Sequence, residues 1–259
     1  MKCHSLIVIP ARRASTRLPE KLLLAETGRP LLAHTIDRAI DAVAALGDAP
    51  LDPQSRIWVV ADDEALLRVA EACGVGGVMT GHCESGTERI WSALPSLPDA
   101  EVVLNLQADE PEMPADWIVD CIRGFSESDP PDIVTVAVPI RADDPSLNDP
   151  NFVKVVVNHR GRAMYFSRAT IPALRKGGVL PNPAALGHLG IYAFSTKFLK
   201  RYPDFPQSPL EKCECLEQLR FLQGGSSIKV LVKEDAHFRG IDTPEDYRAF
   251  VDRKRGMAR

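Results

Sequence analysis

Short apolar runs rich in β-branched residues alternate with longer stretches whose apolar residues recur every three or four positions. The short runs predict buried strands over residues 5–9, 56–60, 102–106 and 133–138. Apolar spacing from Leu32 to Leu46, and again from Leu66 to Cys73, predicts helices that each present one apolar face. This alternation is typical of an α/β fold, in which helices cover both faces of a mostly parallel sheet.

The pattern changes after residue 140. Residues 141–151 are mainly turn formers, and residues 172–187 are rich in proline and glycine, which predicts a loop or arm. Further strands are expected over residues 152–157, 190–194 and 228–232, and a helix from Leu210 to Leu219. Because the chain has no internal repeat, we expect a single domain over residues 1–259, with an inserted arm at about 145–190.

Composition and charge argue against several classes of protein. The chain has 259 residues, 45% apolar and 25% charged, and its net charge of −4 does not suit binding to nucleic acid. No apolar run reaches the roughly 18 residues of a membrane-spanning helix, and the first one is too short for a signal peptide. We therefore expect a cytoplasmic protein. Its six cysteines, from Cys3 to Cys215, lack zinc-like spacing and are expected to be reduced thiols.

Positive charge is concentrated directly after the first predicted strand. Residues 10–21 include four cationic side chains and two hydroxyls, namely Arg12, Arg13, Arg17 and Lys21 with Ser15 and Thr16. Ligands of open α/β sheets bind beyond the carboxyl ends of the strands, so this segment is expected to hold the phosphates of a nucleoside triphosphate. The glycine spacing of a Walker loop is absent, and the alternative is a solvated basic loop.

Two acidic residues stand at positions that suit a divalent cation. Asp109 follows the predicted strand at 102–106, and Asp242 precedes a helix start marked by Thr243. Mg²⁺ prefers one or two carboxylates together with phosphate oxygens, so the two residues favour a magnesium site. The alternatives are that Asp109 caps a turn and that Asp242 belongs to the helix cap.

A third segment, Glu84-Ser85-Gly86-Thr-Glu-Arg89, precedes a predicted helix. Its backbone donors suit the edge of a base or a ribose. Turns of this composition are also common as ordinary helix starts, and both interpretations are open from the residues alone.

The order of the motifs is more specific than any one of them. Along the chain stand Pro10-Ala-Arg-x-x-Ser-Thr-Arg-Leu-Pro-x-Lys21, Ser-Gly-Thr-Glu-Arg89, Gln-x-Asp-Glu-Pro111, Tyr165-Phe-Ser-Arg168, His188-Leu-Gly-Ile-Tyr192, Leu216-Glu-Gln-Leu-Arg220 and Asp242-Thr-Pro-Glu-Asp246. This series closely resembles the 3-deoxy-manno-octulosonate cytidylyltransferase family, and the resemblance runs from about Ile7 to Tyr247.

The resemblance implies a Rossmann-like nucleotidyltransferase core with a mixed, mostly parallel sheet, and a homodimer whose dimerisation arm comes from the middle of the chain. It implies transfer of CMP from CTP to the anomeric hydroxyl of 3-deoxy-D-manno-octulosonate (Kdo), with release of pyrophosphate, for lipopolysaccharide biosynthesis. CTP and Kdo would be its small-molecule partners, and Mg²⁺ its cofactor.

The resemblance also implies roles for individual residues. By motif position, CTP would be held by Arg12, Ser15, Arg17 and Lys21, with Ser85, Gly86 and Arg89 near the base or ribose. Mg²⁺ would be held by Asp109 and Asp242, which form the catalytic group together with Arg12 and Lys21. The sugar pocket would be lined by Gln107, Arg168, His188, Tyr192, Glu217 and Gln218.

Several of these positions have plainer interpretations, and the chain departs from the family pattern in places. Arg168 suits a surface cation, and His188 and Tyr192 suit an ordinary strand and core. Glu20 and Ala108 stand where the family has glycine, Ala61 where threonine is common, and the stretch at 80–85 is one residue short. Base recognition is therefore less firmly predicted than phosphate and metal binding.

Three rival functions follow from the same residues. In the first, the acceptor is another ulosonic acid, such as sialic acid or 8-amino-Kdo. In the second, the protein is a glycosyltransferase that consumes a nucleotide sugar. In the third, it is a non-catalytic nucleotide sensor. Glycosyltransferases commonly carry Asp-x-Asp at the strand end, which Gln107-Ala-Asp109 lacks. A sensor would not need both Asp109 and Asp242.

Overall fold

The computed structural model of the chain describes residues 4–47, 53–176, 178, 181–234 and 240–257. Contacts between Cα atoms group the chain into two compact units, Met1–Ile122 with Phe238–Arg259, and Arg123–His237. The predicted arm at about 145–190 lies entirely within the second unit. The single domain over residues 1–259 stays a prediction.

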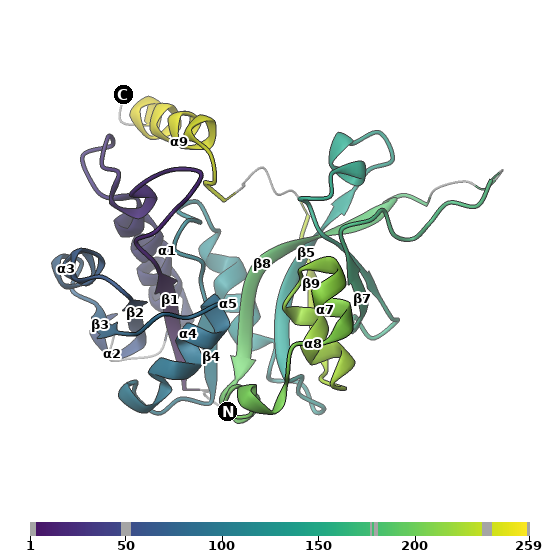
Figure 1. Cartoon of the computed structure of the whole chain (residues 1–259), viewed down its shortest axis with the longest axis horizontal. Coiled ribbons are helices and arrows are strands. Elements are labelled where there is room, and N and C mark those ends of the chain that lie inside the picture. Colours follow the sequence, from purple (N-terminus) through teal and green to yellow (C-terminus); the bar gives the residue numbers. More distant parts are fainter. Residues whose placement is uncertain (1–3, 48–52, 177, 179–180, 235–239, 258–259) are drawn as a thin grey trace. The chain divides into compact units, whose positions relative to one another are not determined.

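The first unit contains a parallel sheet. Its strands are β1 (Ser5–Ala11), β2 (Ile57–Ala61), β3 (Gly76–Met79) and β4 (Val102–Asn105), in the order β3-β2-β1-β4. Its helices are α1 (Leu31–Leu46), α2 (Pro53–Arg56), α3 (Glu64–Ala72), α4 (Gly86–Ala93), α5 (Ala115–Arg123) and α9 (Pro244–Met257), with 3-10 turns η1 (Lys21–Leu23) and η2 (Leu94–Ser96). Figure 1 shows these strands side by side, with α1, α3 and α4 beside them and α9 above them.

Burial explains why these residues form this sheet. Every residue of β1 and β4 is buried, as expected for parallel strands that are covered on both faces. The predicted strands at 5–9, 56–60 and 102–106 are thereby confirmed, as are the helices α1 and α3. The short strand β3 was not predicted, because two of its four residues are Gly76 and Gly77.

Local hydrogen bonds mark where several helices start. The side chain of Asp63 accepts from the backbone N–H of Ala65 at the start of α3, and Ser85 accepts from Glu88 at the start of α4. At the start of α9, Thr243 Oγ1 accepts from the N–H of Asp246 at 3.2 Å, which confirms the predicted cap.

The second unit is built around β5 (Ile133–Ile140), which pairs antiparallel with β8 (Ala185–Ser195) and parallel with β9 (Ile228–Val232). β6 (Lys154–Val157) pairs antiparallel with β7 (Ala163–Ser167) and with β8. The remaining elements are α6 (Thr196–Leu199), α7 (Pro209–Glu214) and α8 (Gln218–Gln223), with 3-10 turns η3 (Pro145–Asn148) and η4 (Tyr202–Asp204). Figure 1 shows residues 181–184, which precede β8, extending away from this sheet.

Two predictions for the second unit need correction. The helix expected from Leu210 to Leu219 is broken, because Cys215 has a φ of 51° and ends α7. The strand expected at 190–194 begins earlier, at Ala185. The strand at 228–232 is confirmed, and β7, which carries Tyr165, was not predicted.

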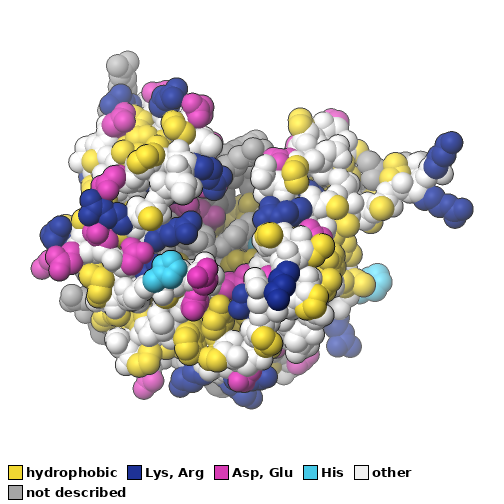
Figure 2. Space-filling model, viewed as in Figure 1, with side chains coloured by type: hydrophobic (Ala, Val, Ile, Leu, Met, Phe, Trp, Pro, Cys, Tyr) yellow, Lys and Arg dark blue, Asp and Glu magenta, His cyan; other side chains and the backbone are white. Residues whose placement is uncertain are grey.

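Among the described residues, no helix is long and apolar enough to cross a membrane. Cys73, Cys83, Cys213 and Cys215 are free thiols, whereas Cys3 lies outside the described residues. On the face drawn in Figure 2, basic and acidic side chains are interspersed over the described surface.

Candidate active site

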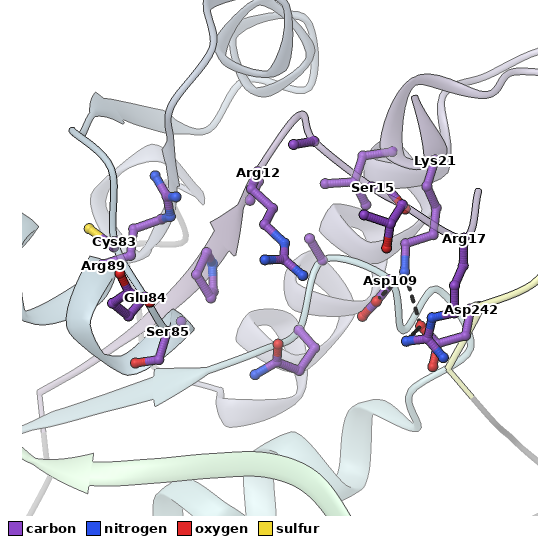
Figure 3. Close-up of a pocket in the computed structure, with 18 residues that line it drawn as sticks. Arg12, Ser15, Arg17, Lys21, Cys83, Glu84, Ser85, Arg89, Asp109 and Asp242 are labelled. Carbon is purple, nitrogen blue, oxygen red and sulfur yellow. Dashed lines mark hydrogen bonds and ion pairs between the residues drawn. The ribbon is translucent and has the colours of Figure 1, made fainter. Parts of the chain in front are cut away.

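The predicted phosphate loop leaves the carboxyl end of β1 and ends at Lys21, whose side chain is only 11% exposed. Its Nζ donates to Asp109 Oδ2 at 2.5 Å and to the carbonyl of Ile241 at 2.8 Å. The same atom lies 3.4 Å from Asp242 Oδ1. One buried ammonium therefore joins three segments that are far apart in the sequence, as Figure 3 shows for the labelled side chains.

Local structure holds the two aspartates in place. Asp109 follows β4, and its carbonyl accepts from the N–H of Ile241 at 2.9 Å. The N–H of Asp242 donates to the Asp246 carboxylate at 3.1 Å, and Arg17 Nη2 donates to Asp242 Oδ1 at 2.9 Å. The expectation that Asp109, Asp242 and Lys21 meet is confirmed, and Asp242 is held by the α9 cap without itself being the capping side chain.

The site also contains a buried acid that the sequence interpretation overlooked. Glu110 is 8% exposed, and its Oε2 has no hydrogen-bond partner among the described residues. Burial, and then the charges of Asp109 and Asp242, raise the pKa of Glu110 to about 8. The protonated carboxyl is therefore favoured at this position, chiefly because the side chain is buried.

The donor atoms around Lys21 suit a hard divalent cation. The carboxylates of Asp109 and Asp242 already converge on one positively charged atom, and oxygen ligands of this kind are those that Mg²⁺ prefers. Within the described residues, no group of three or more His, Cys, Asp or Glu side chains suits a metal. Two carboxylates fit Mg²⁺ only if substrate oxygens and water supply the remaining ligands.

A cavity of about 300 Å³ opens beside these residues. It is lined by ten of the predicted site residues, namely Arg12, Ser15, Arg17, Lys21, Ser85, Gly86, Arg89, Gln107, Asp109 and Asp242. Figure 3 shows Lys21, Asp109 and Asp242 on one side of it and Ser85 and Arg89 on the other, with Arg12 between them.

The two sides of the cavity differ in how far their side chains are already engaged. The guanidinium of Arg12 has no partner within the described part of the chain, so it is available to an anion. Gly86 lets the start of α4 lie close to Pro10, because a Cβ atom on residue 86 would be only 3.3 Å from Pro10 Cγ. Ser85 is engaged as the N-cap of α4, so its hydroxyl serves the helix.

Arg89 is the most constrained of the predicted nucleotide residues. Its side chain is 5% exposed and forms an ion pair with Asp62, with Nη2 and Oδ2 3.0 Å apart. Its Nη1 donates to Thr80 Oγ1 at 2.5 Å and to the carbonyl of Gly81 at 3.3 Å. Asp62 was missed at the level of sequence, although a carboxylate directly after a buried strand was a signal that could have identified it.

Five predicted sugar-binding residues belong to the second unit. His188 is buried, its ring centroid lies 5.3 Å from that of Tyr192, and its Nε2 is 2.9 Å from Thr135 Oγ1. Burial lowers the pKa of His188 to about 3, so its ring is neutral at physiological pH. Glu217 accepts from the hydroxyl of Tyr202 at 3.1 Å, and Gln218 is buried at the start of α8.

Arg168 is engaged more fully than its predicted role suggests. Its Nε, Nη1 and Nη2 donate to the carbonyls of Glu214, Pro150 and Cys215 at 2.7, 3.1 and 3.2 Å. Two of its five N–H groups remain for a ligand. Its proposed pairing with a sugar carboxylate stays a prediction.

Comparison with known proteins shows the family of the chain. A family model described as cytidylyltransferase matches residues 6–229. A 3-deoxy-manno-octulosonate cytidylyltransferase of Chlorobium limicola is 40% identical over 94% of this chain and 94% of its own length. One from an Anaeromyxobacter species is 39% identical over 97% of this chain and 95% of its own. This chain belongs to that cytidylyltransferase family.

A solved member of the family shares the fold. The structure of CMP:2-keto-3-deoxy-manno-octonic acid synthetase complexed with CTP matches with a TM-score of 0.85 and 32% identity, over 98% of this chain and 99% of that one. The α/β fold with a mixed, mostly parallel sheet is thereby confirmed.

The departures from the family pattern have visible structural consequences. Glu20 has a φ of 55°, in the left-handed region that favours glycine, and its carboxylate pairs with Arg13 and does not line the cavity. Ala108 is not among the described non-glycine residues with positive φ, so its backbone does not require glycine. At position 61, alanine has no side-chain hydroxyl to offer. Its backbone carbonyl accepts from the N–H of Thr80 at 2.7 Å.

Proposed function

We propose that this cytidylyltransferase transfers CMP from CTP to the anomeric hydroxyl of Kdo, with release of pyrophosphate, and so supplies CMP-Kdo for lipopolysaccharide biosynthesis. The observation that carries the proposal is the meeting of Lys21 with Asp109 and Asp242 at the edge of a cavity that Arg12 also lines. The relatives that match nearly the whole chain bear the corresponding name.

The cationic residues account for the phosphate chemistry. Arg12 and Lys21 are proposed to bind the triphosphate and to stabilise the negative charge that develops on the leaving pyrophosphate. Arg17 and Ser15 extend the same loop along the cavity and would fix the orientation of the phosphates. Such positioning contributes roughly 7–11 kcal/mol to barrier reduction in favourable systems. No side-chain general base is assigned.

Mg²⁺ would be held by Asp109 and Asp242. When bound, it would neutralise phosphate charge and act as a Lewis acid at the reacting centre. The chain's own contribution is to keep both carboxylates oriented. In the absence of ligands, Lys21 does so by pairing with each of them.

By motif position, sugar recognition is assigned to Gln107, Arg168, His188, Tyr192, Glu217 and Gln218. Because His188 is neutral, it would act as a hydrogen-bonding group rather than as a cation for the sugar carboxylate. Kdo is proposed in preference to 8-amino-Kdo or sialic acid because the relatives' names specify it.

We further propose that the chain works in the cytoplasm as a homodimer, with the arm at about 145–190 as its dimerisation arm. Support comes from Leu174 within this arm, a large apolar side chain that is 52% exposed. Light scattering after gel filtration tests the homodimer; a mass of one chain of 28.4 kDa would contradict it.

Pyrophosphate release tests the proposed reaction. The purified protein is mixed with CTP and Mg²⁺, with and without Kdo, and then with 8-amino-Kdo or sialic acid in place of Kdo. We expect Kdo-dependent release at a rate well above that with either analogue. Equal or faster release with an analogue would reassign the acceptor, and no release with any acceptor would refute the reaction.

A further inference from the structure

A single carboxylate outside the cavity connects the two sides of the candidate active site. Asp62 follows β2 and is not among the described residues that line the cavity. Its Oδ1 accepts from the backbone N–H of Arg13, and its Oδ2 accepts from Arg89 Nη2, both at 3.0 Å. Arg13 belongs to the phosphate loop, and Arg89 belongs to α4 on the opposite side (Figure 3).

The phosphate loop needs such a connection because residues 12–17 belong to no helix or strand. The positions of Arg12, Ser15 and Arg17 therefore depend on contacts that the loop itself makes. The backbone of Arg13 is fixed by Asp62, and its guanidinium is fixed by Glu20 at 2.9 Å and by Asp63 at 3.0 Å. The hydrogen bond to Glu20, and then that to Asp63, also raise the pKa of Arg13, so the guanidinium stays charged.

Arg89 needs the same carboxylate for a different reason. A guanidinium whose side chain is 5% exposed must be paired with an anion or it is strongly destabilising. Asp62 supplies that anion, while Thr80 and Gly81 occupy Nη1. Arg89 is thereby held against the turn that follows β3, with part of its surface lining the cavity.

We infer that Asp62 is a positioning residue, which sets the phosphate loop and the Arg89 side of the cavity at the separation that CTP requires. The inference rests on the proposed function, because it assumes that CTP occupies this cavity. Asp62 would act through the backbone of Arg13 and the side chain of Arg89, without touching the nucleotide.

Asp63 provides a matched control. It is the neighbouring residue, its side chain is 24% exposed against 28% for Asp62, and it also pairs with Arg13. Of Arg13 and Arg89, Asp63 contacts only the side chain of Arg13. It also caps α3, a role that asparagine fills equally well. Asp63→Asn thus removes a charge at almost the same place but leaves the link between the two sides intact.

The test compares the Kd of CTP with Mg²⁺, measured by titration calorimetry, for the wild type, Asp62→Asn and Asp63→Asn. The KM for CTP and the kcat for pyrophosphate release are measured in parallel. For Asp62→Asn we expect Kd and KM to rise at least about tenfold, because the NH2 group of the new amide opposes either Arg89 or the N–H of Arg13, whereas kcat changes less than about threefold. For Asp63→Asn we expect changes within about twofold.

A double-mutant cycle with Arg89→Lys tests the link where Asp62→Asn folds, and Arg89→Lys alone, which is expected to weaken CTP binding, tests it where Asp62→Asn does not. Arg89→Lys keeps the positive charge but cannot span Asp62 and Thr80 together. If Asp62 acts through Arg89, the Kd of the double variant for CTP is no higher than that of the single variant that binds CTP less tightly. A rise in Kd equal to the product of the two single rises contradicts the link. Circular dichroism identifies unfolded variants.

Two results overturn the inference. One is a folded Asp62→Asn variant whose Kd for CTP is within about twofold of that of Asp63→Asn; the other is a loss confined to kcat. A wild type that binds CTP but does not release pyrophosphate refutes the proposed reaction and leaves the calorimetric comparison decisive. A wild type that does not bind CTP overturns both.

Discussion

Glu110→Gln should make the folding stability of the protein less dependent on pH between pH 5 and pH 8.5. Glu110 is buried beside Asp109 and Asp242, and its pKa in the folded chain is raised from 4.5 to about 8. The protonated carboxyl is thus favoured in the fold. Its contribution is complete below pH 4.5, and it is lost as pH rises through the folded pKa.

The magnitude follows from the difference between the two pKa values, which is 8 minus 4.5. At about 1.4 kcal/mol per unit, the wild type loses up to about 5 kcal/mol of unfolding free energy across this range because of Glu110. Glutamine does not titrate, so the variant is spared this loss. Its amide carries a burial cost of its own, which is the same at every pH.

Urea unfolding followed by tryptophan fluorescence measures this effect, in the absence of nucleotide and metal. Trp58, Trp91 and Trp117, the three tryptophans of the chain, all lie in the first unit with Glu110. The stability of Glu110→Gln minus that of the wild type should increase steadily from pH 5 to pH 8.5. Taking the difference cancels groups common to both proteins, such as His188.

Glu112→Gln is the matched control, since Glu112 is two residues away and its carboxylate forms an ion pair with Arg253 at 2.6 Å. The unfolding free energy of Glu112→Gln minus that of the wild type should stay constant above pH 6. The reasoning is refuted if the Glu110→Gln difference is equally flat, since a flat curve means that Glu110 is ionised in the fold.

Three further predictions concern the site and the second unit. Asp109→Asn or Asp242→Asn should reduce kcat by at least about a hundredfold with circular dichroism unchanged; near-wild-type turnover in either would remove that residue from the metal site. Lys21→Ala should raise the KM for CTP by at least about tenfold, and an unchanged rate at limiting CTP would count against the phosphate loop. Arg220→Met should lower the unfolding free energy by about 3–5 kcal/mol, because it leaves the 7% exposed Glu211 carboxylate without its partner; a loss below about 1 kcal/mol in thermal or urea unfolding would show that the pair is not effectively buried.

Much of the fold could be predicted because its signals are local. The strand at 228–232 and the cap at Thr243 depend on neighbouring residues, and both are found where the pattern places them. The meeting of Lys21 and Asp109 was also predictable, because parallel strands direct their carboxyl ends to one edge of the sheet.

The remaining features depend on contacts that sequence spacing does not encode. The break at Cys215 requires a left-handed backbone at a residue type that seldom adopts it. The pairing of Asp62 with Arg89 joins residues 27 positions apart on different elements. The buried Glu110 lies near Gly240, a residue far along the chain: its Cγ is 3.8 Å from the position that a Cβ atom on Gly240 would take.

The central claim is that Asp109 and Asp242 together bind the metal of a CTP complex beside Lys21. A crystal structure of the protein with CTP and Mn²⁺, with anomalous scattering recorded for manganese, tests it most directly. The claim predicts an anomalous peak within about 2.3 Å of a carboxylate oxygen of each aspartate, with the triphosphate contacting Arg12 and Lys21. A peak that neither carboxylate ligates, or CTP bound elsewhere, would contradict it.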